Sequence, residues 1–236
     1  MSPPDAPGAG LGGHEPAGVA GAGLGAHEPA GVAAFDFDGT LVGGDSLMSF
    51  LALLHGRRGA GRLLALAAPA MTAAYRTRGR DGAKLALLRR ALSGLPAEWV
   101  AEVGEGYGHR LATQLRPTMA ERLGWHRERG HRLVLVSASL ATYLNPFGRL
   151  LGLDEVIATQ LEEGPDGLLT GRLVGPNVRG AEKATRLAAA LATWADADRK
   201  IEMWAYGDSA GDREMLAMSD HPLLVGGRRR RGTHVT

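Results

Sequence analysis

Three short apolar runs that end in polar residues constrain the fold of this chain more than any other feature of its sequence. They are Val-Ala-Ala-Phe-Asp-Phe-Asp at residues 32–38, His-Arg-Leu-Val-Leu-Val-Ser at residues 131–137 and Ile-Glu-Met-Trp-Ala-Tyr-Gly-Asp at residues 201–208. Such runs are typical of strands that are buried on both faces. Helical patterns separate them, and strands that alternate with helices favour a parallel sheet with right-handed crossovers. We therefore predict an α/β fold with a Rossmann-like core, in which helices cover both faces of a parallel sheet.

Shorter elements are predicted from periodicity and from turn residues. Further strands are expected at residues 155–159, 168–174 and 221–225. Further helices are expected at residues 117–130, 180–193 and between residues 208 and 218. The sequence Gly-Pro-Asp-Gly at residues 164–167 predicts a turn before the strand at residues 168–174, because glycine, proline and aspartate favour turn conformations.

The segment between the first two apolar runs is predicted to be a helical insertion. From residue 46 to about residue 116 the apolar residues recur at helical spacing, and scattered glycines divide this pattern into three or four helices. We expect residues 46–116 to form an α-helical cap. The α/β core is then expected to consist of residues 31–45 and 117–227.

The longest apolar stretch of the chain, Leu63–Tyr75, lies inside this insertion. Pro69 interrupts it, and it is shorter than the ~20 residues that a membrane-spanning helix requires. We expect a helix that is buried in its own domain here. The alternative is an amphipathic helix that seeks a surface.

The two ends of the chain differ in composition from the rest. The segment Gly8–Ala20 recurs 13 residues later as Gly21–Ala33, with one Gly replaced by Ala. Gly, Ala and Pro at this density cannot bury enough apolar surface to offset chain entropy, so residues 1–30 are predicted to be a disordered low-complexity tail. Residues 228–236 begin with four arginines and are predicted to be a solvated basic tail.

Composition excludes several classes of protein. There is no cysteine in the 236 residues, which excludes disulfides, a cysteine nucleophile and thiolate metal sites, and is consistent with a reducing cytoplasm. The formal net charge is only +2 and aromatic residues are 5%, whereas a nucleic-acid surface favours a basic stripe with interleaved aromatics. The N-terminus lacks the apolar region of an export signal. We predict a cytoplasmic protein with no nucleic-acid partner and no stable membrane insertion.

Four carboxylates are predicted to meet at the carboxyl edge of the sheet, where ligands bind in folds of this class. Asp36 and Asp38 follow the first strand with the same side-chain parity, and Asp208 ends a later strand with Asp212 four residues on. Carboxylates so close together repel one another, so a cation is expected among them. Oxygen ligands without His or Cys suit Mg²⁺.

Two further residues complete the chemistry of a phosphate site. Ser137 offers a hydroxyl at the end of the second strand, and Lys183 offers a positive charge at the start of a helix. A carboxylate nucleophile, a metal, a hydroxyl and a lysine together fit phosphoryl transfer through an aspartyl-phosphate. The other two lysines, Lys84 and Lys200, are expected to lie on the surface.

The segments that carry these residues resemble the four motifs of the haloacid dehalogenase-like (HAD) superfamily. Asp-Phe-Asp-Gly-Thr-Leu-Val at residues 36–42 resembles the first motif, Leu-Val-Ser at residues 135–137 the second, Lys183 the third and Gly-Asp-Ser-Ala-Gly-Asp at residues 207–212 the fourth. They occur in the expected order. The helical insertion between the first two motifs is similar to the cap of the phosphoserine-phosphatase-like branch, subfamily IB.

This resemblance implies a Mg²⁺-dependent phosphatase that acts on a small phosphomonoester. It implies that Asp36 attacks phosphorus, and that Asp38 protonates the leaving oxygen and then deprotonates the hydrolytic water. For that role the pKa of Asp38 must be raised towards neutrality. The resemblance further implies that Asp36, the backbone carbonyl of Asp38 and Asp208 ligate the metal, with Asp212 in support.

The remaining implied roles concern phosphate and substrate. Thr40 is implied to hold the first motif loop, while Ser137 and Lys183 bind the phosphoryl oxygens. Asp45 stands where the phosphoserine enzymes carry Glu for the substrate amine, so it is either a pocket residue or the N-cap of the first cap helix.

The second motif also departs from those enzymes, because Ala138-Ser139 follows it instead of a glycine pair. Both departures touch substrate contacts, and the alcohol is left open. Two alternative functions are a phosphotransferase that uses another alcohol as acceptor and a phosphate-binding module without turnover. The presence of Asp38 argues against the module.

Overall fold

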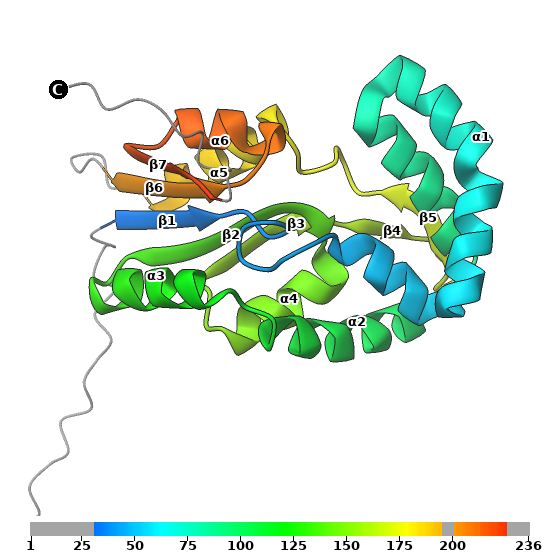
Figure 1. The fold of residues 1–236 in the computed structure, drawn as a ribbon, viewed down its shortest axis with the longest axis horizontal. Helices are drawn as coiled ribbons and strands as arrows, with labels where there is room; N and C mark the ends of the chain where they lie inside the picture. The colour runs from blue at the N-terminus through cyan, green and yellow to red at the C-terminus, as the bar shows by residue number, and fades with distance from the viewer. Residues whose placement is uncertain (1–30, 195–200, 226–236) are drawn as a thin grey trace, which may run out of the picture.

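The computed structural model describes residues 31–194 and 201–225, and its centre is a five-stranded sheet (Figure 1). The strands lie in the order β3-β2-β1-β6-β7 and every neighbouring pair is parallel. Their bounds are β1 Gly31–Phe35, β2 Arg132–Leu140, β3 Glu155–Thr159, β6 Glu202–Gly207 and β7 His221–Leu224. The predicted α/β class with a parallel sheet is confirmed.

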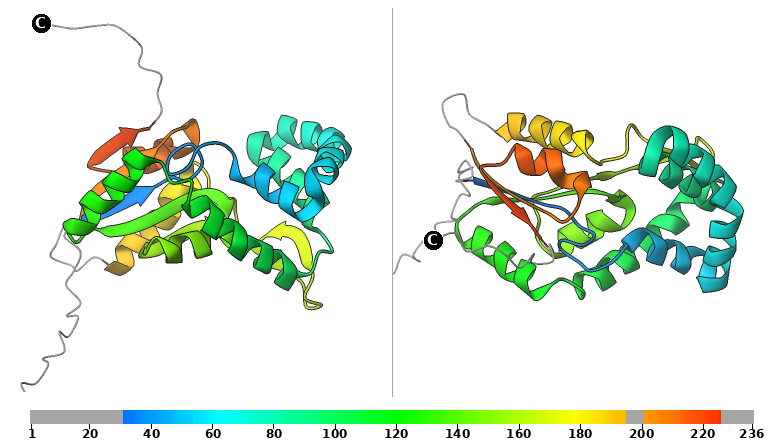
Figure 2. Two further views of the ribbon diagram at one scale, coloured as in Figure 1. Left: turned by 60° about the horizontal axis from the view of Figure 1, so that its bottom comes forward. Right: turned by 45° about the horizontal axis from the view of Figure 1, so that its top comes forward.

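Helices cover both faces of this sheet (Figure 2). The helices outside the predicted insertion are α3 Pro117–Glu128, α4 Ala141–Leu150, α5 Ala181–Trp194 and α6 Arg213–Ala217. Successive side chains of a strand point to opposite faces. Phe35 of β1 therefore packs in one apolar cluster with α3 and α4, whereas Ala34 packs in a second cluster with α5 and α6. This arrangement confirms the prediction of helices on both faces.

The strand predicted at residues 168–174 lies outside the parallel sheet. It is β5 Leu169–Leu173, which pairs antiparallel with β4 Leu161–Glu163. The predicted turn joins the two strands, with the backbone N–H of Gly164 donating to the carbonyl of Leu168 at 2.8 Å. A tight turn can join only antiparallel neighbours, because parallel strands need a long crossover. The prediction of a strand is thus confirmed, but not as a member of the core sheet.

The segment predicted as a cap contains α1 Ser46–Leu92 and α2 Ala97–Ala112. Gly56 and Gly79 have non-helical backbone angles with φ of +70° and +60°, a region that glycine adopts far more readily than other residues. They divide α1 into three helical pieces, which fold back on one another at the side of the molecule away from β7 (Figures 1 and 2). Together with α2 these pieces give the expected three or four helices.

The cap segment shares an apolar core with the sheet. The cluster that contains Phe35 continues through Leu88 of α1 and Leu111 of α2. The division of the chain into separate cap and core domains remains a prediction.

The apolar stretch Leu63–Tyr75 is exposed, so the expectation of a buried helix is wrong. Leu66 is 52% exposed and Tyr75 56% exposed. Only one narrow stripe, formed by Leu63, Ala67 and Met71 at four-residue spacing, packs towards the main apolar cluster. In the described part of the chain, no helix combines the length and apolar character needed to cross a membrane.

Three other predictions fall outside the described residues. They are the disordered tail at residues 1–30 with most of its tandem repeat, the basic tail at residues 228–236, and the surface position of Lys200.

Candidate active site

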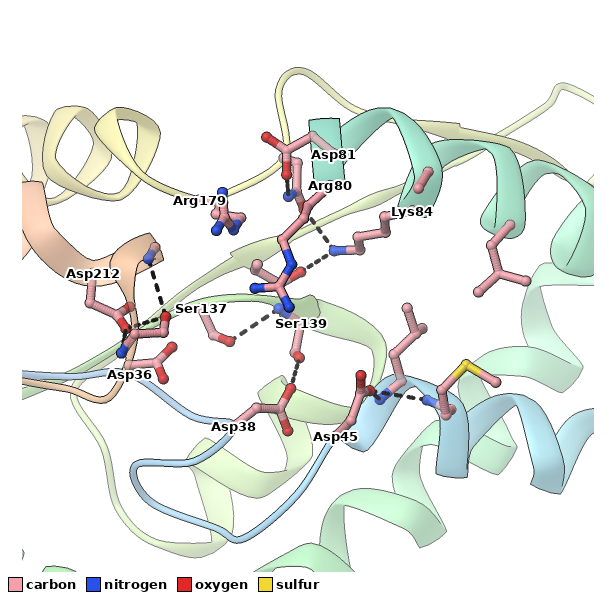
Figure 3. Close-up of a pocket in the computed structure, with 18 of the residues that line it drawn as sticks. Asp36, Asp38, Asp45, Arg80, Asp81, Lys84, Ser137, Ser139, Arg179 and Asp212 are labelled. Atoms are coloured by element: carbon pink, nitrogen blue, oxygen red, sulfur yellow. Dashed lines mark hydrogen bonds between the residues drawn. The ribbon is translucent and has the colours of Figure 1, made fainter. Parts of the chain in front are cut away.

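A pocket of about 520 Å³ opens at the carboxyl edge of the sheet (Figure 3). The chain order explains why the predicted residues meet there. Asp36 directly follows β1, which lies between β2 with Ser137 and β6, which Asp208 follows. Lys183 and Asp212 reach the same pocket from α5 and from the short helical turn before α6. The structure therefore brings together the residues predicted for phosphate and metal binding.

Asp36 is held by two donors. Its carboxylate accepts hydrogen bonds from Nζ of Lys183 and, at 3.2 Å, from Oγ1 of Thr40. Nζ of Lys183 also donates to Oδ1 of Asp212 at 2.6 Å. Asp36, Lys183 and Asp212 are 6%, 2% and 1% exposed, so one buried ammonium lies between two buried carboxylates. Thr40 is fully buried, and its role in holding the first motif loop stays a prediction.

The two buried carboxylates differ in proton affinity. Burial raises the pKa of Asp36 to about 6, although the ammonium of Lys183 acts in the opposite direction. Burial also acts to raise the pKa of Asp212, but the Lys183 charge and the hydrogen bonds from Ser209 hold that pKa below its usual value. Both Oγ and the backbone N–H of Ser209 donate to Asp212, at 2.9 and 3.0 Å.

Asp38 faces a different set of partners. Its carboxylate accepts hydrogen bonds from Oγ of Ser139 at 2.5 Å, and from both Oγ and the backbone N–H of Ser46 at 2.9 Å. Burial raises the pKa of Asp38, and these hydrogen bonds counteract the rise. A carboxyl group with a raised pKa suits the acid and base role implied for Asp38.

Three carboxylates are arranged to hold a cation. Oxygen atoms of Asp36, Asp208 and Asp212 lie within 4.8 Å of one another. Burial raises the pKa of Asp208, and the neighbouring Asp212 charge adds to the rise. The donor set contains only oxygen, as Mg²⁺ prefers. The residues therefore fit Mg²⁺. The carboxylate of Asp38 is engaged with Ser46 and Ser139, and it is the family resemblance that implies its backbone carbonyl as a metal ligand.

Ser137 is 2% exposed and lines the pocket. Its Oγ accepts a hydrogen bond from the backbone N–H of Ser139 at 3.0 Å, which fixes the hydroxyl beside Asp36 and Asp38 (Figure 3).

Asp45 is both the N-cap of the first cap helix and a pocket residue, the two alternatives that the sequence left open. Its Oδ1 accepts hydrogen bonds from the backbone N–H groups of Leu47 at 3.0 Å and Met48 at 3.2 Å, so it caps the N-terminus of α1. It also lines the pocket, on the side of Asp38 (Figure 3).

Lys84 is not an ordinary surface lysine, contrary to expectation. Its Nζ donates to the carbonyl of Ala138 and, at 2.6 Å, to Oδ1 of Asn177. Burial lowers the pKa of Lys84 to about 8. Arg80 and Arg179 add two further cations to the pocket wall (Figure 3).

Arg80 and Lys84 were missed because helix periodicity does not show which face of α1 lies over the sheet edge. The rarity of lysine was the available signal, since two of the three lysines in the chain line the pocket. For Ser139 the signal was its strand parity, which is the same as that of Ser137.

Comparison with known proteins gives the family of the chain. The sequence model of the haloacid dehalogenase-like hydrolases matches residues 33–217. Protein CicA of Caulobacter vibrioides is 38% identical over 189 residues, which are 79% of this chain and 82% of CicA. Phosphoserine phosphatase SerB2 of Mycobacterium tuberculosis is 34% identical over 185 residues, which are 77% of this chain but only 41% of SerB2. Among solved structures, a protein of unknown function from Bordetella pertussis has a TM-score of 0.62 at 26% identity, covering 79% of this chain and 85% of that one.

The matched residues include all four predicted motifs, from Asp36 to Asp212. The resemblance to the haloacid dehalogenase-like superfamily is confirmed by the family match, and SerB2, one of the sequence relatives, is named a phosphoserine phosphatase. The chain belongs to the haloacid dehalogenase-like hydrolase family, and the expected enzyme class, a hydrolase of phosphoric monoesters, agrees with the phosphatases among its relatives.

Proposed function

We propose that this chain is a Mg²⁺-dependent phosphatase that hydrolyses a phosphomonoester through an aspartyl-phosphate on Asp36. The observation that supports this most directly is the position of Asp36. It lies at the end of the central strand, faces the pocket, and is held by Lys183 inside a group of three carboxylates. A carboxylate fixed in this way is placed to act as a nucleophile on a phosphoryl group.

In the first step a carboxylate oxygen of Asp36 forms a bond to phosphorus while the bond to the ester oxygen breaks. Asp38, whose pKa burial raises, acts as the acid in this step and gives its proton to the departing alkoxide, so the alcohol leaves neutral. Ser137 and Lys183 bind the phosphoryl oxygens and offset their charge.

In the second step Asp38, now ionised, takes a proton from a water molecule that attacks the phosphorus of the aspartyl-phosphate. Inorganic phosphate leaves and the carboxylate of Asp36 is restored. Ser46 and Ser139 hold Asp38 in place through both steps. Mg²⁺, held by Asp36, the Asp38 carbonyl and Asp208 with Asp212 in support, would supply positive charge to the phosphoryl group.

The nature of the alcohol is the open part of this proposal. The relative SerB2 is named a phosphoserine phosphatase. In this chain Asp45 takes part in capping α1. Arg80, Lys84 and Arg179 line the pocket together with Asp45 and Asp81, so the wall beyond Asp36 carries side chains of both charges. We propose that the enzyme works in the cytoplasm, which agrees with a chain that contains no cysteine.

A phosphate-release screen over a panel of phosphomonoesters tests the proposal. We expect release in the presence of Mg²⁺, loss of release with a chelator and recovery when excess Mg²⁺ is added back. Failure to release phosphate from every ester, with Mg²⁺ present and a folded protein, would contradict the proposal. Addition of a second alcohol separates hydrolysis from phosphotransfer, because a transferase would form a new phosphate ester at the expense of inorganic phosphate.

A further inference from the structure

The middle piece of α1, residues 57–78, carries an unusual amount of exposed apolar surface, and we refer to it as the cap arm. Leu64, Leu66 and Tyr75 are 38%, 52% and 56% exposed. Small apolar residues between them are exposed as well, namely Ala65, Ala68, Pro69, Ala70 and Ala73. A contiguous exposed apolar patch on a folded protein commonly marks an interaction surface.

The charges around this patch have one sign. Between Gly56 and Arg80 there are six arginines and no aspartate or glutamate. All six are exposed: Arg57, Arg58, Arg62, Arg76, Arg78 and Arg80. In the sequence they stand on both sides of the apolar stretch Leu63–Tyr75. A helix with an apolar surface and flanking arginines is the pattern of a helix that lies in the interface of an anionic membrane.

The apolar surface of the cap arm continues into the active-site pocket. Leu64, Met71 and Tyr75 of the arm line the same cavity as Asp36 and Asp38. A ligand whose phosphate lies at Asp36 would therefore have its alcohol portion directed towards the arm.

We propose that the cap arm docks on an anionic lipid surface and that the substrate is a phosphomonoester with a hydrocarbon chain. The docking part stands on the arm alone, whereas the substrate part rests on the proposed phosphatase activity. Charge favours this occupant over a second copy of the chain, because two arms in contact would bring ten arginines together. The contact is peripheral, in keeping with the absence of a membrane-spanning helix from the described residues.

Sedimentation of the full chain with vesicles tests docking without any need for catalysis. We expect binding to vesicles of phosphatidylcholine mixed with phosphatidylglycerol, weak binding to phosphatidylcholine alone, and release at high salt. Leu66→Ser should lower the partition coefficient about tenfold, and Arg57→Gln with Arg58→Gln about thirtyfold.

Two variants on distant helices serve as matched controls. Leu150 of α4 is 55% exposed, close to Leu66, so Leu150→Ser should leave vesicle binding unchanged. The exposed pair on α3, changed by Arg122→Gln with Arg127→Gln, should lower binding much less than the pair on the arm. Equal binding to both kinds of vesicle, or equal losses in arm and control variants, would overturn the docking proposal. Self-association that Leu66→Ser abolishes would instead assign the arm to a second copy and also overturn it.

The substrate part has its own measurement, in which Leu66 is useful because it does not line the pocket. Leu66→Ser should leave hydrolysis of a water-soluble phosphomonoester unchanged and slow the release of phosphate from a long-chain alkyl phosphate held in anionic vesicles about tenfold. Hydrolysis of the soluble ester with none of the vesicle-bound one would overturn the substrate class alone. Absence of hydrolysis with both would count against the proposed phosphatase and leave the vesicle-binding result standing.

Discussion

The carboxyl edge of the sheet and the cap arm differ in which kind of side chain they bury. At the sheet edge, Asp36, Lys183 and Asp212 are almost fully buried although all three are ionisable. On the arm, Leu66 and Tyr75 are more than half exposed although both are largely apolar. Each arrangement has a free-energy cost, which is the burial of charge at the sheet edge and the exposure of apolar surface on the arm.

At the sheet edge the cost is desolvation, which the fold offsets with hydrogen bonds. Each buried carboxylate accepts hydrogen bonds from Lys183 and from a hydroxyl group, Thr40 for Asp36 and Ser209 for Asp212. Removal of one partner of such a group leaves a buried charge unpaired, which typically costs about 3–5 kcal/mol. Charges fixed in this way need no rearrangement when a phosphoryl group develops negative charge.

On the arm the cost is exposed apolar surface, and little holds the piece in place. One stripe, with Leu63 and Met71 at its two ends, packs towards the body of the protein. Segments with few buried contacts open locally at a small free-energy cost. We therefore expect the arm to differ from the sheet edge in stability, in response to mutation and in response to pH.

The largest difference should appear in catalysis. Asp36→Asn keeps the size of the side chain but removes the attacking charge, so phosphate release should fall by about 10⁴-fold or more. The melting temperature should show that the variant still folds. Leu66→Ser on the arm should leave release from a soluble phosphomonoester unchanged. Substantial turnover by a verified Asp36→Asn preparation would falsify the role of Asp36.

A smaller difference should appear in stability. Leu135 is fully buried in β2 and Leu66 is 52% exposed, so the same substitution can be compared at both positions. We expect Leu135→Ala to lower the free energy of unfolding by about 2–5 kcal/mol and Leu66→Ala to change it by less than about 0.5 kcal/mol. Urea unfolding followed by circular dichroism measures both. Similar losses at the two positions would show that the arm is packed as firmly as the sheet.

The same contrast explains what the sequence could predict. The residues of the sheet edge were predictable because the carboxyl ends of parallel strands must meet, and Asp36, Ser137 and Asp208 stand at three such ends. Lys183 was predicted from its position at the start of a helix and from the resemblance to the third motif of the family. Local patterns sufficed there, because strand period and chain order fix where those side chains lie.

Local sequence patterns did not predict which helices, strands and side chains contact one another across long stretches of the chain. An apolar helix such as Leu63–Tyr75 has the same sequence pattern whether its surface is covered or not, and tertiary contacts decide between the two. Lys84 reaches Ala138 across 54 residues, and Ser139 reaches Asp38 across 101 residues. The strand β5 and the turn before it were predicted from the sequence. The sequence did not show that β5 pairs with β4 and lies outside the core sheet.

The body of the protein and the cap arm should also differ in how they respond to pH. His126 lies between Nδ1 of His131 and the hydroxyl of Tyr206, each at 2.8 Å, and burial lowers the pKa of His126 to about 4. The unfolded chain takes up a proton near the ordinary value of 6.5, whereas the native state does so only near 4. The contribution of His126 to stability should therefore be complete above pH 6.5 and fall by about 1–3 kcal/mol as the pH drops towards 4. Asp36, whose pKa is raised to about 6, contributes with the opposite sign in this pH range.

Denaturant unfolding of the wild type and of His126→Gln at several pH values isolates this contribution, because the difference between the two profiles should shrink as the pH falls from 6.5 to 4 while the contribution of Asp36 is common to both proteins. An unchanged pH profile in that variant would show that other groups cause the loss. The cap arm contains no His, Asp or Glu, so vesicle binding by the arm should change little over the same pH range.

The smallest effect is expected at Asp45, where the body meets the cap. Both of its backbone hydrogen bonds go to one carboxylate oxygen, and Asn caps a helix about as well as Asp. Asp45→Asn should therefore leave the melting temperature and the hydrolysis of an aryl phosphate close to those of the wild type.

Because the side chain lines the pocket, we expect KM to rise about fivefold for a phosphomonoester with an amine near the phosphate. The rise is small because an exposed carboxylate is screened by water. Steady-state kinetics of this one variant with both substrates measure the two KM changes, so that the aryl phosphate serves as the control for the amine substrate. Equal KM changes for the amine and aryl substrates would eliminate amine recognition by Asp45 and leave it only the cap of α1.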